Sequence, residues 1–221
     1  MTGTAGLRAD LVTRFRAMAE AGLNKGTSGN ASVRLPEGVP PGFLVTPSGR
    51  PPETLTADDL VVIRDDGRAE GTLEPSSEWR LHLDVYAAFP DAGAVLHAHS
   101  AFATALACQR AEIPPFHYLL ALFGGSTIRC ADYATFGTQA LSDAAVAALE
   151  GRRACLLANH GMLVHGRDLD HALLLAVQLE MLSEQYWRSR MLGPPVLLTD
   201  AEMADASAQF ARYARLTGNP G

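Results

Sequence analysis

The feature that most limits the fold of this chain is a series of short apolar segments joined by tight turns in its first third. Val33–Leu35 and Phe43–Thr46 are β-prone, and a Pro- and Gly-rich stretch at 36–42 separates them. Leu60–Ile63 follows, with Asp65–Gly67 as a hairpin turn. Because such turns join antiparallel strands, and because helical segments lie between them, this pattern favours an antiparallel sheet covered by helices over a regular βαβ series.

Helical periodicity occupies much of the remaining chain. Leu7, Leu11, Phe15 and Met18 recur every three or four residues, which predicts a helix over about residues 5–21 that ends at Gly22. Further helices are expected over 77–89, 101–110, 117–123, 142–149, 169–190 and 200–216, and further strands over 94–100, 153–159 and 162–164. We therefore predict an α/β protein that forms one domain over residues 1–221, with a central, mostly antiparallel β-sheet covered by helices on both faces.

Bulk composition excludes several classes of function. The chain has 221 residues, 48% of them hydrophobic and 19% charged, as expected for a soluble globular domain. Its net charge is −6 and it has no basic stripe, so nucleic acid is not an expected partner. No apolar run approaches the roughly 18 residues that a membrane-spanning helix needs. The N-terminus lacks the apolar core of a secretion signal, and three widely spaced cysteines favour a reducing compartment, so we expect a cytoplasmic protein.

Two histidines in one β-prone segment give the first indication of chemistry. His97 and His99 lie in the run Ala94–Ser100, and in an extended strand they point the same way with Cα atoms about 6.6 Å apart. A single histidine on such a strand is usually a buried, hydrogen-bonded residue, but burying two without a shared partner is costly. With His160 and Glu78 they would form a zinc-type site of three histidines and one carboxylate. The other histidines, His82, His117, His165 and His171, are expected at the surface or behind the ligands.

Three polar segments are suited to hold an anion. The loop Leu23–Asn30 is rich in small residues that let backbone N–H groups surround an anion, with Thr27 and Asn30 as further donors. The turn containing Ser48 and Gly49 adds donors of the same kind. Ser76 and Ser77 stand at a predicted helix N-terminus, where either one caps the helix and a phosphate is favoured. Each segment is also a common connector or cap, but Glu78 follows directly, so anion and metal would be neighbours.

These motifs together resemble the class II aldolase/adducin family, and the resemblance covers the chain from Gly22 to Tyr213. The segments that carry it are Gly22–Arg34, Thr46–Gly49, Pro75–Arg80, Val95–His99, Ile113–Tyr118, Tyr133–Thr138 and Asn159–Gly161. Within the family, the pattern is most similar to the fuculose-type aldolases. That similarity implies reversible cleavage of an L-fuculose-1-phosphate-like ketose 1-phosphate into dihydroxyacetone phosphate and an aldehyde.

The resemblance also implies a role for each candidate site residue. His97, His99, His160 and Glu78 match the ligands of Zn²⁺, with Mn²⁺ or Co²⁺ as other divalent candidates, and Glu78 also matches the residue that transfers a proton. The residues that match phosphate-binding positions are Thr27, Asn30, Ser48, Gly49, Ser76 and Ser77. Tyr118 and Tyr213 match catalytic tyrosines, the first of which reaches into a neighbouring subunit, and Phe136 and Phe210 match residues that line the aldehyde side. A homotetramer with active sites at the subunit interfaces is therefore expected.

The proposed chemistry is consistent with general principles. Breaking the C3–C4 bond leaves an enediolate, and a cation held by three histidines keeps positions open for substrate oxygens. Glu78 acting as a base requires a carboxylate whose pKa is raised in the occupied site. Lys25 is the only lysine of the chain and lies in the expected phosphate loop, which argues against a Schiff-base route.

Several alternatives remain at this point. Glu78 replaces the aspartate expected in the 4-epimerases of the family. Ala98, Asn159 and the region Phe102–Thr104 depart from the fuculose-type pattern, which leaves a 3-oxo-tetronate 4-phosphate decarboxylase or a 5-deoxypentulose-1-phosphate aldolase open. A non-catalytic adducin-like scaffold and a purely structural metal site are more distant possibilities, which a zinc determination and chelation would distinguish.

Overall fold

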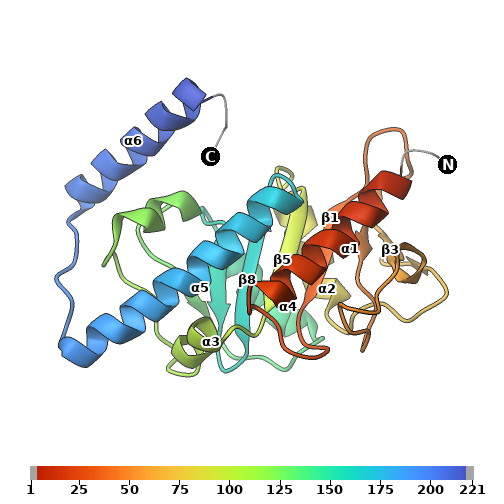
Figure 1. Ribbon diagram of the computed structural model, residues 1–221, viewed down its shortest axis with the longest axis horizontal. Helices are drawn as coiled ribbons and strands as arrows, with labels where there is room; N and C mark the ends of the chain where they lie inside the picture. The colour runs from red at the N-terminus through yellow and green to blue at the C-terminus, as the bar shows by residue number, and fades with distance from the viewer. Residues whose placement is uncertain (1–3, 218–221) are drawn as a thin grey trace.

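An eight-stranded sheet runs through the middle of the molecule in the computed structural model, which describes residues 4–217 (Figure 1). In spatial order, the strands are β4 (Ala69–Glu70), β3 (Val61–Arg64), β2 (Gly42–Val45), β1 (Asn30–Arg34), β5 (Ala94–Ala98), β8 (Gly161–Gly166), β7 (Ala154–Leu157) and β6 (Cys130–Ala131). Every neighbouring pair is antiparallel except β6 and β7, which are parallel. The predicted mostly antiparallel α/β fold is confirmed.

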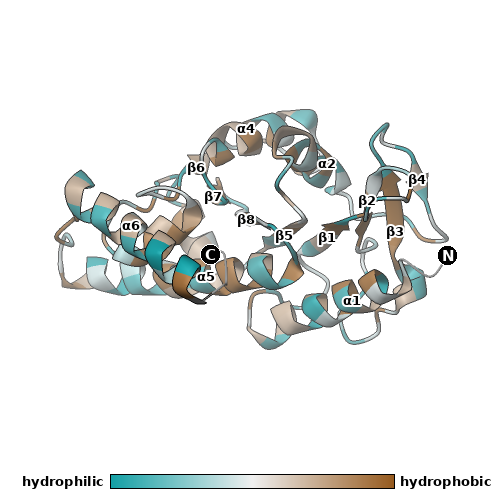
Figure 2. Ribbon diagram, turned by 90° about the horizontal axis from the view of Figure 1, so that it is seen from above, coloured by the Kyte–Doolittle hydropathy of each residue, from teal (hydrophilic) through white to brown (hydrophobic). Residues whose placement is uncertain are grey.

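Helices cover both faces of this sheet, as predicted. The helices are α1 (Ala5–Glu20), α2 (Trp79–Ala88), α3 (Ala101–Ala107), α4 (Gln139–Leu149), α5 (Leu169–Leu192) and α6 (Asp200–Thr217), with 3₁₀ turns η1 (Ala57–Asp59) and η2 (Tyr118–Phe123). Figure 2 shows α2 and α4 on one side of the sheet and α1 and α5 on the other. Helix α3 packs beside α5, and α6 projects from the body near η2 (Figure 1).

Each face of the sheet has its own hydrophobic core. Successive strand residues point to opposite faces, so Leu96 joins the core beneath α1, α3 and α5, while its neighbour Val95 joins the core beneath α2 and α4. Because both faces are covered, every residue of β5 and β8 is buried, and these two strands are apolar except at His97 and His165. A polar side chain on β5 therefore has to find its partners inside the protein.

Several boundaries differ from the sequence-based expectations. The helix expected from residue 77 begins at Trp79 and its N-cap is Glu78, so the assignment of the cap to Ser76 or Ser77 is wrong. The helix expected over 117–123 is the 3₁₀ turn η2, and α3 ends at Ala107 instead of continuing to residue 110. The two-residue strands β4 and β6 were not expected, because two residues are too few to show a periodicity.

Two bulk expectations can also be compared with the structure. Cys108, Cys130 and Cys155 are all free, as the odd number and wide spacing indicated. Within residues 4–217, no helix combines the length and the apolar character needed to cross a bilayer.

Candidate metal and phosphate site

Four elements bring the candidate metal ligands to one point beside the middle of the sheet. His97 lies on β5, and its backbone pairs with Asn30 of β1 on one side and Leu163 of β8 on the other. His99 stands just past the end of β5 and His160 in the turn between β7 and β8. Glu78 is the N-cap of α2. The turn is tight because Asn159 adopts a positive φ of 54°, which asparagine tolerates better than most residues.

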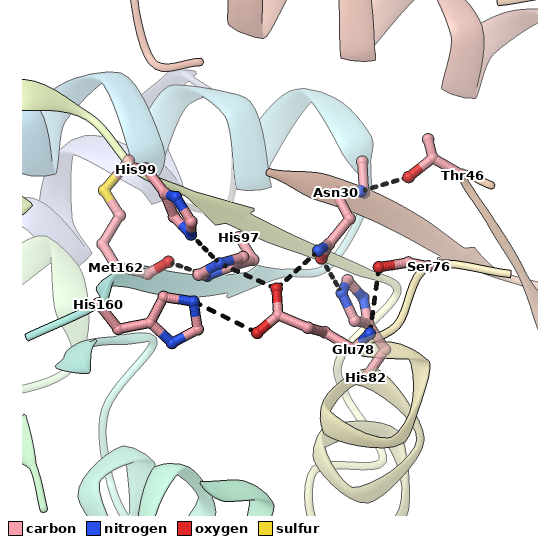
Figure 3. A network of polar contacts seen from close by, with 10 residues as sticks. Asn30, Thr46, Ser76, Glu78, His82, His97, His99, His160 and Met162 are labelled. Carbon is pink, nitrogen blue, oxygen red and sulfur yellow. Dashed lines mark hydrogen bonds and ion pairs between the residues drawn. The ribbon is translucent and has the colours of Figure 1, made fainter. Parts of the chain in front are cut away.

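The four side chains converge closely. One ligand atom from each of Glu78, His97, His99 and His160 lies within 4.8 Å of the others, and the three ring centroids are 4.7–4.9 Å apart. Figure 3 shows the Glu78 carboxylate directed between the rings of His97 and His160. Its Oε2 lies 3.2 Å from His97 Nε2, and its Oε1 lies 3.4 Å from His160 Nε2. The predicted cluster is thus brought together in space, although its residues come from three separate parts of the chain.

The donor set fits a divalent cation. His97 donates from Nδ1 to the Met162 carbonyl at 2.9 Å, which leaves the Nε2 lone pair facing the cluster. His97 Nε2 and His99 Nε2 face each other at 2.9 Å, an arrangement that a shared cation between ring nitrogens explains. Glu78 Oε1 is buried and accepts no hydrogen bond from the described residues. Three imidazole nitrogens and one carboxylate form an ordinary zinc ligand set.

Electrostatics favour the protonation states that metal binding requires. Burial, together with the neighbouring His97, lowers the pKa of His160 to about 4 and also lowers the pKa of His99, so both rings are neutral near pH 7. Burial alone would raise the pKa of Glu78, but its electrostatic interactions with His97 and His160 and the hydrogen bond from Asn30 lower it below the ordinary value. Without substrate, the Glu78 carboxylate is therefore ionised. The raised pKa expected from the sequence refers to the site with substrate bound.

A pocket of about 360 Å³ opens onto three of the four candidate ligands, Glu78, His99 and His160. All six candidate phosphate residues, Thr27, Asn30, Ser48, Gly49, Ser76 and Ser77, line it, together with Ser28, Gly29, Pro47, Glu78, His99, Phe136 and His160. His97 is fully buried beneath this pocket. The anion and metal sites expected from separate motifs thus share one cavity, at the N-terminal end of α2 where the helix dipole favours an anion.

Backbone hydrogen bonds join the two serine segments of this pocket. The Ser48 N–H donates to the Glu74 carbonyl and the Ser76 N–H donates to the Thr46 carbonyl, around a β-bridge between Pro47 and Pro75. These N–H groups are therefore already used. The Ser76 hydroxyl accepts from the Glu78 N–H at 3.3 Å, so its own proton remains available to a ligand of the pocket.

Phe136 reaches the rim of the pocket because its loop packs closely on the serine segment. Gly137 follows it with a φ of +73°, and a Cβ at this position would lie 3.0 Å from the Ser77 carbonyl oxygen. Only glycine accommodates both the backbone conformation and the close approach. Phe136 is 63% exposed, as a residue expected to meet the aldehyde part of a substrate would be before binding.

The three remaining candidates lie elsewhere in the same chain. Tyr118 of η2 stacks on Phe210 of α6, with ring centroids 6.0 Å apart, and Tyr213 follows one helical turn later. Tyr118 is 51% exposed and Tyr213 65% exposed, and none of the three lines the pocket of its own subunit.

Sequence reasoning missed the group of residues behind Glu78. Asn30 was expected to contact phosphate, but its side chain also donates to Glu78 Oε2 at 3.0 Å and contacts His82 Nε2 at 2.5 Å. His82 was expected at the surface or behind the ligands and is fully buried. The signal that could have revealed it is the spacing of Glu78, His82 and Tyr86, which places three polar side chains on one face at the start of this helix.

Comparison with known proteins identifies the family of this chain. The family model described as "Class II Aldolase and Adducin N-terminal domain" matches residues 9–187. A 5-methylthioribulose-1-phosphate/5-deoxyribulose-1-phosphate aldolase from Rhodospirillum rubrum is 48% identical over 94% of this chain and 92% of its own length. An L-fuculose phosphate aldolase from Escherichia coli is 42% identical over 89% of this chain and 90% of its own.

A solved structure described as L-fuculose 1-phosphate aldolase superposes with a TM-score of 0.89 at 38% identity, covering 93% of this chain and 96% of the other. The family match spans most of the chain, and these relatives align over nearly their whole lengths. The chain therefore belongs to the class II aldolase/adducin family and is an enzyme of the lyase class.

Proposed function

We propose that this enzyme cleaves a ketose 1-phosphate reversibly into dihydroxyacetone phosphate and an aldehyde, with a divalent cation held by Glu78, His97, His99 and His160. The observation that carries the proposal is the shared cavity, in which the convergent ligand set and the candidate phosphate residues are neighbours. Zn²⁺ suits three imidazoles and a carboxylate best, and Mn²⁺ or Co²⁺ would be the next candidates. The cation would supply positive charge that stabilises the negative charge left when the C3–C4 bond breaks.

The protein's own groups would perform the remaining steps. The phosphate would be held by Thr27, Asn30, Ser48, Gly49, Ser76 and Ser77, which fixes the substrate by contacts remote from the reacting bond. In the synthetic direction, the Glu78 carboxylate would take a proton from C3 of dihydroxyacetone phosphate, and the electron pair of the C–H bond would remain on the substrate. Lys25 is exposed and does not line the pocket, as expected for a route without a Schiff base.

The aldehyde is proposed to carry a short apolar tail. The similarity to fuculose-type aldolases predicted an L-fuculose-like substrate, but the 48% identity to a methylthioribulose/deoxyribulose phosphate aldolase supports the 5-deoxypentulose alternative better. Cleavage of a 5-deoxypentulose 1-phosphate between C3 and C4 leaves a two-carbon aldehyde without a hydroxyl group. Phe136 and Pro47 are apolar residues of the cavity that such a tail would contact.

A substrate panel tests this assignment. The zinc-loaded enzyme would be offered 5-deoxyribulose 1-phosphate, 5-methylthioribulose 1-phosphate, L-fuculose 1-phosphate and a 3-oxo-tetronate 4-phosphate, with and without a chelator. Released dihydroxyacetone phosphate would be measured by coupled reduction, and carbon dioxide separately. We expect kcat/KM to be at least about tenfold higher for the two deoxy-type substrates, a difference of about 1.4 kcal/mol in transition-state binding. Preferred cleavage of the fuculose phosphate, or release of carbon dioxide, would contradict the substrate assignment.

We further propose that the enzyme is a cytoplasmic homotetramer whose active sites are completed by Tyr118 and Tyr213 of a neighbouring subunit. Both tyrosines are exposed and lie outside the pocket of their own chain. Apolar side chains are also exposed along α5, at Leu174, Val177, Trp187, Met191 and Leu192, and their burial between subunits would be favourable. The free cysteines are compatible with a reducing compartment.

Mixing two inactive variants tests the shared site. If Glu78 and Tyr118 of one active site come from different subunits, Glu78→Gln and Tyr118→Phe subunits mixed in one oligomer form some sites with both native residues. Activity should therefore reappear on mixing and reach about a quarter of the native value per site at an equal ratio, the statistical fraction for two independent contributions. Light scattering on the same samples would report the oligomeric state. Absence of any recovery in verified mixed oligomers would show that each site is complete within one chain.

A further inference from the structure

A continuous chain of hydrogen bonds between buried polar side chains runs behind the pocket, from Glu78 to Tyr86. Asn30 Nδ2 donates to Glu78 Oε2 at 3.0 Å, and Asn30 Oδ1 lies 2.5 Å from His82 Nε2. His82 Nδ1 lies 2.6 Å from Ser32 Oγ, which in turn lies 2.8 Å from the Tyr86 hydroxyl. The four residues behind Glu78 are each at most 5% exposed. We call this hydrogen-bonded series the polar ladder; its members in order are Glu78, Asn30, His82, Ser32 and Tyr86.

The ladder exists because a helix and a strand have matching repeats. Glu78, His82 and Tyr86 recur every four residues along α2, a rise of about 6 Å per step. Asn30 and Ser32 are two residues apart on β1, a rise of about 6.6 Å. Side chains from the two elements therefore alternate in register where α2 packs on the sheet. Figure 3 shows the first part of this arrangement, with Asn30 between Glu78 and His82.

Hydrogen-bonding chemistry gives the ladder a single direction. An ionised carboxylate can only accept, so the amide nitrogen of Asn30 must face Glu78 and its oxygen must face His82. The oxygen also only accepts, so His82 carries its proton on Nε2. Neutral His82 then accepts at Nδ1 from the Ser32 hydroxyl, and Ser32 accepts from Tyr86. Burial lowers the pKa of His82 to about 3, which is consistent with the neutral ring.

The two carboxylate oxygens of Glu78 have different hydrogen bonds. Oε2 receives the Asn30 hydrogen bond, whereas Oε1 is buried without a hydrogen-bond donor among the described residues. The next step rests on the proposed aldolase function. We propose that His82 and Ser32 are positioning residues that hold Glu78 through Asn30. Oε2 is thereby fixed, and Oε1 is the oxygen that takes the proton from C3 of dihydroxyacetone phosphate. The C–H bond breaks, an O–H bond forms at Oε1, and the electron pair stays on the substrate.

Ser32→Ala is the main test, because it removes one hydroxyl group from a fully buried position and leaves the volume nearly unchanged. His82 Nδ1 then loses its donor, so the ring keeps only its contact with Asn30 and both side chains are held less firmly. In the zinc-loaded enzyme, the rate of deuterium exchange at C3 of dihydroxyacetone phosphate should fall about 10- to 100-fold, with KM within twofold and zinc content unchanged. Ser142→Ala is the matched control, since Ser142 is also buried and its hydroxyl has no hydrogen-bond partner within residues 4–217.

A spectroscopic measurement separates this proposal from the proposed function. Nitrogen-15 NMR of zinc-loaded protein should show His82 as the Nε2–H tautomer, with the Nδ1 resonance displaced by loss of its hydrogen bond in Ser32→Ala and unchanged in Ser142→Ala. His82→Gln, which keeps a donor toward Asn30, should retain more exchange activity than His82→Leu. An Nδ1–H tautomer in the native protein, a native exchange rate in Ser32→Ala, or equal loss in both His82 variants would overturn the ladder. If the native enzyme exchanges no proton at all, the aldolase proposal and the role of Oε1 fail, while the tautomer still decides whether the ladder has the stated direction.

Discussion

Glu78 lies where the start of a helix, the histidine cluster and the pocket meet. It is the N-cap of α2, its carboxylate oxygens lie 3.2 and 3.4 Å from two histidine nitrogens, and it lines the 360 Å³ pocket. Its side chain makes no capping hydrogen bond, because the carboxylate is turned toward the histidines. The start of α2 thus lacks a side-chain capping hydrogen bond, and the Glu78 carboxylate contacts His97 and His160 instead.

Replacing Glu78 and His97 should separate proton transfer from metal retention. Glu78→Gln keeps an oxygen ligand beside three histidines but loses the base, so zinc should remain while exchange at dihydroxyacetone phosphate falls by about 10²- to 10⁴-fold. His97→Ala removes the fully buried ligand and should abolish zinc retention. Elemental analysis and deuterium exchange would measure both effects. Full zinc occupancy in His97→Ala would rule out this set of ligands.

At the scale of elements, the segment that carries His99 is held in place by a helix on the opposite face. Helix α3 begins at Ala101, and its N-cap Ser100 makes no side-chain capping bond. Instead, Glu180 of α5 accepts hydrogen bonds from the Ser100 hydroxyl at 2.6 Å and from the Phe102 and Ala103 N–H groups at 2.8 and 2.9 Å. A carboxylate from a distant part of the chain therefore caps α3 one residue after a candidate ligand.

Glu180→Ala should therefore affect both stability and metal binding. Three acceptor contacts are lost at a helix N-terminus, so the free energy of unfolding should fall by about 1–3 kcal/mol. Zinc affinity should fall as well, because His99 becomes less well positioned. Urea denaturation and competition with a chelator would measure these changes. Glu184→Ala, one turn further along α5, is the control, and its surface ion pair with Arg188 should contribute less than about 1 kcal/mol. Equal effects of the two substitutions would argue against the capping role.

At the scale of the whole molecule, buried histidines remote from the site make the fold sensitive to acid. His171 is 4% exposed near the start of α5, and its Nδ1 accepts from the Arg167 N–H. Burial, with the charges of Arg167 and Arg153, lowers its pKa to about 4. The unfolded chain binds this proton near pH 6.5. The stability that the neutral ring contributes is therefore complete above pH 6.5 and is lost as the pH falls toward 4.

His171→Gln should flatten this part of the pH dependence. The native protein should lose up to about 3 kcal/mol through this residue between pH 6.5 and 4, whereas the variant cannot take up the proton. Urea midpoints measured across that range in the metal-free protein would show the difference. His117→Gln is the comparison, because His117 is only partly buried. Parallel pH curves for native protein and His171→Gln would contradict the linkage.

Local patterns in the sequence determined the class of fold and most of the site. The turns after β1 and β3, the periodicity of α1 and the β-prone segment of His97 are properties of neighbouring residues, so they can be read without a structure. His97 and His99 are close in the chain. The grouping of His160, Glu78 and the phosphate segments with them was a hypothesis from residue type that the family resemblance supported, since spacing alone cannot bring distant segments together.

Tertiary packing decided the features that depend on contacts between distant segments. The register that places Asn30 beside His97, the interleaving of α2 with β1 that forms the polar ladder, and the capping of α3 by Glu180 all join residues dozens of positions apart. The start of α2 belongs to the same group, because Glu78 takes the N-cap position with its carboxylate beside the histidines, while the Ser76 hydroxyl accepts from the Glu78 N–H. Hydrophobic pattern specifies which face of an element is buried, but only the packed sheet and helices determine which polar groups meet there.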